Sequence, residues 1–261
     1  MSSPDRPGTG RLVLVPNTLD LGAAPEPIAQ VLPVGVLQRA AGLRHWVVEN
    51  AKSTRAFLKR CDAVAPLALP LQQLDIQELP RPRKGAAPGA DAPQDWERLL
   101  APALAGGEVA LQSEAGLPGV ADPGAALVMA AHRAGLAVEP LPGPSSLTLA
   151  VAASGLNGQR FAFEGYLPQD AAARAQRVKT LEQRSRQEGQ TQLVIETPYR
   201  NTALLQALVA QLSPGTWLSV AWGLTSAGGG CRTLKVSQWR QLPADQRTLA
   251  SDLPAVFMWL A

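Results

Sequence analysis

The hydrophobic positions of this chain fall into short apolar runs separated by segments with helical spacing. In the first half, the runs predict buried strands at residues 11–15, 45–49, 67–71, 109–111 and 138–141. Helices are predicted between them at residues 53–60, 94–104 and 125–133. In the second half, strands are expected near Phe161, Leu193, Trp217, Thr233 and Val256. This alternation indicates an α/β fold.

The length of 261 residues allows two ordinary domains. Residues 80–93, PRPRKGAAPGADAP, predict an exposed loop inside the first domain rather than a boundary. A more plausible boundary follows the helix that ends near Gly155. We therefore expect an N-terminal α/β domain of residues 1–155 and a C-terminal α/β domain of residues 156–261.

Two strand-to-helix turns stand out because they consist of glycine, proline and small residues. They are residues 113–124, SEAGLPGVADPG, and residues 140–147, PLPGPSSL. In a parallel sheet such turns lie at the carboxyl ends of strands, where ligands bind. The pair predicts a small-molecule site whose walls are mostly backbone, and the alternative is that both turns are ordinary connections.

Local signals place the helices that follow these turns. Asp122 before Pro123 predicts an N-cap and a first helical position. Gly135 is expected to end that helix. Ser145 or Ser146 can cap the next one.

A third turn follows the apolar run at residues 192–196. Thr197 is expected to cap, and Pro198 to open, a helix that runs to Leu212. The free amides of such a helix end suit an anionic group, and simple capping is the alternative.

A basic segment at residues 171–186 also predicts a helix. Its cations either form a solvated face or contact RNA phosphates. They are Arg174, Arg177, Lys179, Arg184 and Arg186.

Four ordered segments carry a resemblance to a known family. They are SEAGLPGVADPGAALVMAAHRAG, PLPGPSSLTLAVAASGL, FAFEGYLP and VIETPYRN, which begin at Ser113, Pro140, Phe161 and Val194. In order and spacing they resemble the tetrapyrrole methylase superfamily. The most similar branch contains the bacterial enzymes that methylate a ribose 2′-hydroxyl in small-subunit ribosomal RNA. The clear match covers residues 109–212.

The resemblance implies a cytoplasmic, homodimeric methyltransferase that uses S-adenosylmethionine, with two α/β domains and the cofactor in the cleft between them. RNA or a ribosomal subunit is the implied partner. The implied cofactor-binding residues are Ser113, Glu114, Ala115, Gly116, Leu117, Val120, Asp122, Ser145, Ser146, Leu147, Glu196, Thr197, Gly223, Leu224, Pro254 and Ala255. The candidates on the substrate side are Asn17, Glu49, Arg55, Tyr199 and Arg200. Spacing alone identifies none of them as a catalytic base.

Several positions depart from the family pattern. Glu114 stands where many relatives have aspartate, and residues 15–22, VPNTLDLG, lack the early glycine. Residues 49–55, ENAKSTR, are rearranged, and residues 223–230, GLTSAGGG, lack an acid and a lysine. These changes affect the substrate side more than the cofactor loops. They indicate a divergent paralogue whose methyl acceptor can differ.

Composition argues against a membrane protein and against a metal site. The chain has no run of eighteen apolar residues, and its start, MSSPDRPGTGRLVLV, lacks the apolar core of a secretory signal, so we expect no membrane partner. Cys61 and Cys231 form no metal pattern and are expected to stay reduced. His45 and His132 are expected in structural or surface roles, so no metal is expected. A net charge of +3 is too small to indicate nucleic-acid binding by itself.

Three classes of function follow from these observations. The favoured class is an RNA methyltransferase close to the ribosomal RNA branch. The second is a methyltransferase for a small metabolite such as a tetrapyrrole, and the third is a cofactor-binding protein that has lost transfer activity. An assay with labelled cofactor and several acceptors in parallel distinguishes them.

Overall fold

The computed structural model describes residues 10–20, 27–80 and 96–261. Most of the loop predicted at residues 80–93, the start of the helix predicted at residue 94, and Gly22 lie outside the described residues. The chain divides into two compact units, Met1–Pro144 and Ser145–Ala261.

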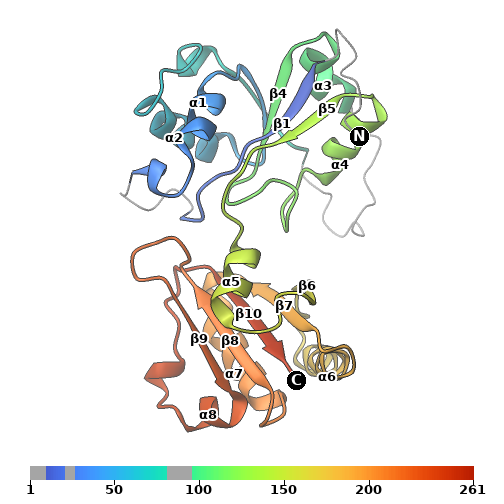
Figure 1. Ribbon diagram of the computed structural model, residues 1–261, viewed down its shortest axis with the longest axis vertical. Coiled ribbons are helices and arrows are strands. Elements are labelled where there is room, and N and C mark those ends of the chain that lie inside the picture. The colour runs from blue at the N-terminus through green and yellow to red at the C-terminus, as the bar shows by residue number, and fades with distance from the viewer. Residues whose placement is uncertain (1–9, 21–26, 81–95) are drawn as a thin grey trace. The chain divides into compact units, whose positions relative to one another are not determined.

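The first unit contains a five-stranded parallel sheet (Figure 1). Its strands are β1 (Arg11–Leu14), β2 (His45–Val48), β3 (Asp75–Glu78), β4 (Glu108–Gln112) and β5 (Ala137–Pro140). They lie in the order β3-β2-β4-β1-β5, and every neighbouring pair is parallel. The carboxyl ends of all five strands therefore meet at one edge.

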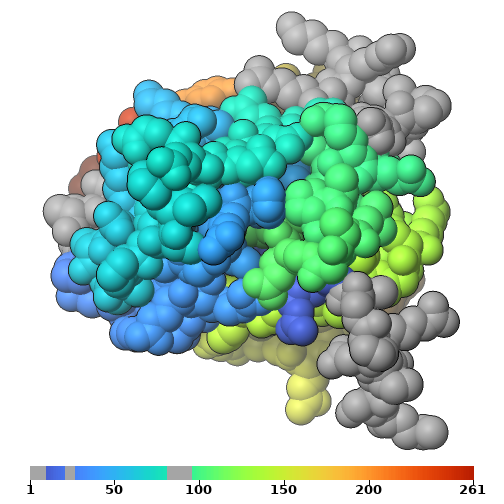
Figure 2. All heavy atoms as spheres, turned by 90° about the horizontal axis from the view of Figure 1, so that it is seen from above, coloured from blue at the N-terminus to red at the C-terminus, as the bar shows by residue number. Residues whose placement is uncertain are grey.

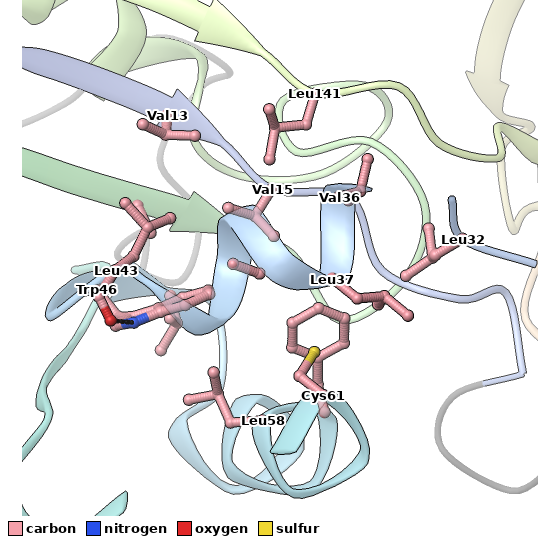
Figure 3. Packing of buried hydrophobic residues seen from close by; sticks show 14 of the residues in the cluster. Val13, Val15, Leu32, Val36, Leu37, Leu43, Trp46, Leu58, Cys61 and Leu141 are labelled. Atoms are coloured by element: carbon pink, nitrogen blue, oxygen red, sulfur yellow. Dashed lines mark hydrogen bonds between the residues drawn. The ribbon is translucent and has the colours of Figure 1, made fainter. Parts of the chain in front are cut away.

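Helices cover both faces of this sheet. α1 (Val34–Ala41) and α2 (Ala51–Asp62) pack on one face, and α3 (Trp96–Leu104) and α4 (Ala125–Arg133) pack on the other. In Figure 3, Val36 and Leu37 of α1 lie between Val15 and the α2 residues Leu58 and Cys61, all in one buried cluster. There the indole of Trp46 donates a hydrogen bond of 3.2 Å to the carbonyl of Leu43. In Figure 2 blue, teal and green segments form much of the surface in view.

The strand predicted at residues 67–71 is wrong. Leu71 begins a short 3-10 helix (Leu71–Gln73), and the strand of this region is β3, which begins at Asp75. Pro66 and Pro70 explain the difference, because proline lacks the N–H that a strand ladder needs. The alternating leucines of this segment still pack against the core.

The second unit contains a mixed five-stranded sheet. Its strands are β6 (Phe161–Tyr166), β7 (Thr191–Glu196), β8 (Trp217–Trp222), β9 (Gly230–Lys235) and β10 (Ala255–Leu260). The order is β6-β7-β10-β8-β9, with β6 parallel to β7 and the other neighbours antiparallel. α5 (Ser146–Ser154) packs on one face. The core on the other face includes α6 (Ala171–Glu188), α7 (Asn201–Gln211) and α8 (Val236–Gln241).

The boundary between the units lies before α5, not near Gly155 as the sequence predicted. Leu147, Ala150 and Val151 of α5 belong to a buried cluster with Leu193 and Val256 of the second sheet. The Thr233 hydroxyl also donates a hydrogen bond of 2.8 Å to the carbonyl of Ser154. Apolar burial and this bond hold α5 in the second unit.

The start of α4 also differs from the prediction. The helix begins at Ala125, with Gly124 at the N-cap position, so neither Asp122 nor Pro123 has its predicted role. Gly124 has a φ of 125°, which a glycine adopts without strain. Gly135 follows the end of α4 with a φ of 71°, as the sequence predicted.

Candidate functional site

The candidate site is built on the carboxyl edge of the first sheet. β4 and β1 are neighbours, but β1 leads toward α1 on one face and β4 leads toward α4 on the other. Neighbouring strands whose connections diverge in this way leave a crevice where ligands of α/β proteins bind. The loop after β1 and the loop of residues 113–124 border this position.

Asn17 joins these two loops. Its backbone N–H donates to the carbonyl of Gly116 at 2.9 Å, and its side-chain amide donates to the carbonyl of Glu114 at 3.0 Å. The side-chain oxygen of this buried residue accepts from the N–H of Thr18 at 2.9 Å. Asn17, predicted on the substrate side, therefore positions the candidate cofactor loop.

Glycine shapes the backbone of the loop. Gly116 and Gly119 have φ values of 66° and 78°, and Ala121 has a φ of 64°. A Cβ on Gly116 would lie 3.3 Å from Cδ2 of Leu19 and 3.5 Å from the carbonyl oxygen of Pro144. Position 116 therefore favours glycine for two reasons: the backbone is left-handed, and the atoms of Leu19 and Pro144 leave little room for a side chain.

The remaining predicted residues of this loop differ in exposure. Ser113 is buried, and Val120 is exposed. Glu114, Ala115, Leu117 and Asp122 have intermediate exposure.

The second predicted turn packs closely on the loop after β1. The N–H of Leu141 donates to the carbonyl of Leu14 at 3.0 Å. A Cβ on Gly143 would lie 2.2 Å from Cβ of Pro16, so no larger residue fits there without movement. This contact brings the chain after β5 to the same edge of the sheet.

Three carboxyl groups influence one another at this edge. Glu49, which follows β2, accepts a hydrogen bond of 3.0 Å from the backbone N–H of Glu114. Burial raises the pKa of Glu49 above its ordinary value. Burial also raises the pKa of Asp122 to about 7, with further contributions from the charges of Glu49 and Glu114. Asp122 is thus a carboxyl group that can exchange a proton near neutral pH.

Buried polar atoms without partners lie beside these loops. Both amide atoms of Gln112 and the hydroxyl of Ser113 form no hydrogen bond within the described part of the chain. Gln112 is fully buried at the end of β4. Buried polar groups are normally paired, so these atoms are available to a ligand or a water molecule. Sequence reasoning missed Gln112 because it continues an apolar strand.

The cations near the first loop also differ from the expectation. Arg60 of α2 forms an ion pair of 3.3 Å with Asp20, and the hydroxyl of Thr18 donates to Asp20 at 2.6 Å. Arg55, predicted on the substrate side, is exposed and donates to the carbonyl of Ala51 within its own helix at 3.4 Å. Arg60 was not predicted, because nothing in its local pattern separates it from an ordinary helix cation.

The predicted residues of the second unit gather at one end of its sheet. Ala255 of β10 pairs with Glu196 of β7 on one side and with Trp222 of β8 on the other. The N–H of Gly223 donates to the carbonyl of Pro254 at 3.0 Å. Thr197 follows Glu196, and Leu224 follows Gly223, so the structure brings this predicted set together within the unit.

Glu196 caps the turn that follows β7. Its Oε1 accepts from the N–H of Thr197 at 2.7 Å and from Nη2 of Arg200 at 2.8 Å. The Arg200 guanidinium lies 5.7 Å from the ring centroid of Tyr199, which is exposed. Thr197 occupies the N-cap position and Pro198 opens the helical turn, as predicted, but the Thr197 hydroxyl makes no capping hydrogen bond. Pro198–Arg200 is a 3-10 turn, and α7 begins at Asn201.

Replacement of Glu196 tests this capping role. We expect Glu196→Gln to lower the free energy of unfolding by about 1 kcal/mol, because the charge-assisted bonds to Arg200 and to the Thr197 amide weaken. Glu188→Gln is the control, since its ion pairs are more exposed and are expected to contribute less than about 0.5 kcal/mol. Urea denaturation measures both. Equal stability of Glu196→Gln and the parent protein would contradict the capping role.

Ser145, Ser146 and Leu147 lie at the start of α5. Ser145 occupies the N-cap position, but its hydroxyl makes no capping hydrogen bond. Leu147 is buried in the cluster that holds α5 on the second sheet. The polar groups that these residues offer a ligand are therefore the serine hydroxyls and the backbone.

The basic residues of α6 are partly paired. Arg177 and Arg184 form ion pairs of 2.5 Å and 3.2 Å with Glu164 of β6. Arg174 donates to the carbonyl of Gln169 at 2.9 Å. The predicted row of cations is therefore not a uniform face, and substitution of Arg177 or Arg184 would remove one of the two partners of Glu164.

No group of three metal-ligating side chains occurs among the described residues. Both cysteines are free, and burial raises the pKa of Cys61 to about 12, so its thiol stays protonated. His45 contacts Asp75 at the surface, with 3.2 Å between Nδ1 and Oδ2. None of the helices in residues 10–20, 27–80 and 96–261 is long and apolar enough to span a membrane.

The fold and this edge define an α/β protein with a candidate small-molecule site. The sequence model of one protein family, the tetrapyrrole (corrin/porphyrin) methylases, matches residues 52–228, which is more than half of the chain. The chain belongs to this family, as the four sequence segments predicted.

Curated relatives match part of the chain. A protein of Escherichia coli O157:H7 named ribosomal RNA small subunit methyltransferase I is 37% identical over 51% of this chain and 45% of its own length. Proteins of the same name from Synechocystis sp. and Xylella fastidiosa are 40% and 47% identical, over 49% and 33% of this chain and 45% and 31% of their own lengths. These matches span less than half the length of each relative.

Solved structures share the fold. A diphthine synthase superposes with a TM-score of 0.56 at 15% identity, covering 96% of this chain and 90% of that one. The methyltransferase CobJ gives 0.54 at 16% identity, covering 96% and 94%. The predicted two-part α/β fold is confirmed.

Proposed function

We propose that this chain is an S-adenosylmethionine-dependent methyltransferase that acts on small-subunit ribosomal RNA in the cytoplasm. The observation that carries the proposal is the match to relatives named ribosomal RNA small subunit methyltransferase I, at 37% to 47% identity. The sequence resemblance favours a ribose 2′-hydroxyl as the acceptor and a homodimer as the assembly.

The residues at the edge of the first sheet fit such a cofactor. Gly116 lets the loop backbone take a left-handed conformation close to Leu19 and Pro144, and the unpaired atoms of Gln112 and Ser113 offer hydrogen bonds. The acidic groups complement a cofactor with a positively charged sulfonium. Gly116 would give the loop its left-handed turn beside the cofactor, and Glu49 would hold the Glu114 amide in place.

S-adenosylmethionine supplies an activated methyl group when it is bound. This chain must then orient the acceptor oxygen and remove its proton. Asp122 is suited to hold that proton, because its pKa of about 7 leaves the carboxylate substantially ionised at neutral pH. It also forms no hydrogen bond with another described residue that would compete for the proton.

Parallel acceptors test the function. The parent protein is incubated with methyl-labelled S-adenosylmethionine and with unmethylated small ribosomal subunits, total RNA or a metabolite extract. We expect label in the RNA of the small subunits, in a dinucleotide that resists alkali because its 2′-hydroxyl is blocked. Label confined to small metabolites would identify a different acceptor, and cofactor binding without transfer would contradict the proposed enzyme.

A further inference from the structure

Strand β6 presents exposed aromatic rings at the edge of the second sheet. It is the first strand in the sheet order, with β7 as its neighbour. Phe161, Phe163 and Tyr166 on this strand are 41%, 36% and 57% exposed. Large rings normally contribute to a core, so the exposure of both Phe161 and Phe163 on one short edge strand indicates a binding surface.

The two phenylalanines lie on the face that carries α5. Phe163 pairs with Leu193, and Leu193 is buried in the cluster of α5. Because side chains alternate along a strand, Phe161 shares this face and Glu164 points to the other. The ladder shifts register between Phe163 and Tyr166, where Gly165 has a φ of 70°.

Arginines accompany this strand on its opposite face. Glu164 pairs with both Arg177 and Arg184, and Arg160 lies 3.9 Å from Glu188. With Arg174, four arginines stand against Glu164, Glu188 and the N-cap carboxylate of Asp170, an excess of one positive charge. Residues 145–163, which lead into this strand and cover its ring-bearing face, contain no aspartate or glutamate.

We propose that the β6 edge, defined as Phe161, Phe163, Tyr166 and the arginines at 160, 174, 177 and 184, binds single-stranded RNA. Bases stack on the exposed rings, and phosphates approach the arginines. The inference rests on the proposed function, because it extends the contact with an RNA substrate beyond the methylated nucleotide. The excess of positive charge favours a polyanion over a second copy of this net-positive chain.

Removal of the rings tests this surface. The probe is a fluorescein-labelled RNA dodecamer of alternating cytidine and uridine, which stays single-stranded, and fluorescence anisotropy gives its Kd. We expect the double variant Phe161→Leu/Phe163→Leu to bind at least about tenfold more weakly, because leucine keeps the apolar packing but cannot stack. Trp217→Leu is the matched control, since it removes a ring of 41% exposure from β8 of the same sheet. It should leave the Kd unchanged.

Charge is tested by Arg160→Gln. The slope of log Kd against log salt should fall in magnitude by about 0.7, as expected when one phosphate contact to a single strand is lost. Calorimetry with S-adenosylmethionine should give the parent value for every variant.

Three outcomes would overturn the inference. They are a parent protein that does not bind the dodecamer at low salt, a double variant that binds it as tightly as the parent, and a double variant that changes from dimer to monomer by light scattering without losing RNA affinity. The last would identify the ring row as a contact between copies. Methyl transfer to small ribosomal subunits by the parent protein is the separate test of the proposed function. That transfer can be observed even when the β6 edge does not bind RNA.

Discussion

Gly116→Val should weaken the binding of S-adenosylmethionine at least about tenfold. The residue has a φ of 66°, a conformation that costs a β-branched residue more than about 1–2 kcal/mol. Its side chain would also meet Leu19 and the Pro144 carbonyl, at the point where Asn17 joins the two loops. Strain and crowding therefore act on the loop proposed to hold the cofactor. Isothermal titration calorimetry measures the affinity.

Gly135→Val provides a matched control. Gly135 has a φ of 71°, so valine meets similar backbone strain, but a Cβ there has no atom within 4 Å. We expect this variant to lose stability of the same order and to keep the parent affinity for the cofactor. Parent affinity in Gly116→Val, with its fold intact by circular dichroism, would mean that the loop is only a connection.

Asp122→Asn should have opposite effects on activity and stability. Loss of a proton acceptor is expected to lower the transfer rate by about a hundredfold or more. Asparagine also removes a half-buried negative charge near Glu49 and Glu114. At pH 8.5 we therefore expect the variant to be more stable than the parent by about 1–2 kcal/mol, a value discounted for partial exposure.

The raised pKa of Asp122 fixes how stability and transfer rate each change with pH. The pKa of Asp122 is raised in the folded protein, so its stabilising contribution is present below about pH 4 and is lost as pH rises through about 7. The transfer rate of the parent should rise over the upper part of this range as the carboxylate forms. Urea denaturation at a series of pH values measures the stability, and single-turnover assays at the same pH values measure the transfer rate. A variant with the parent's rate and the parent's pH profile would exclude Asp122 as the proton acceptor.

The elements with strong local signals could be predicted from the sequence. β1, β2 and β4 follow apolar runs, and Gly135 and Gly155 end their helices in left-handed conformations. These features depend on a few neighbouring residues, which the sequence displays directly.

Features that depend on tertiary contacts could not be predicted in the same way. The alternating leucines at residues 67–71 look like a strand, but proline and core packing decide their conformation. Asp122 looks like a cap, but the loop reaches Gly124 before α4 begins. Gln112 continues an apolar run, so only its burial without a hydrogen-bond partner marks it. The pairing of Glu164 with two arginines of α6 likewise requires the packed structure.

Calorimetric titration of the unaltered protein with S-adenosylmethionine tests the central claim most directly. The account predicts one binding site per chain, competition by S-adenosylhomocysteine, and loss of most of the affinity in Gly116→Val but not in Gly135→Val. The absence of binding heat and of any thermal shift at millimolar concentrations of either ligand would contradict it.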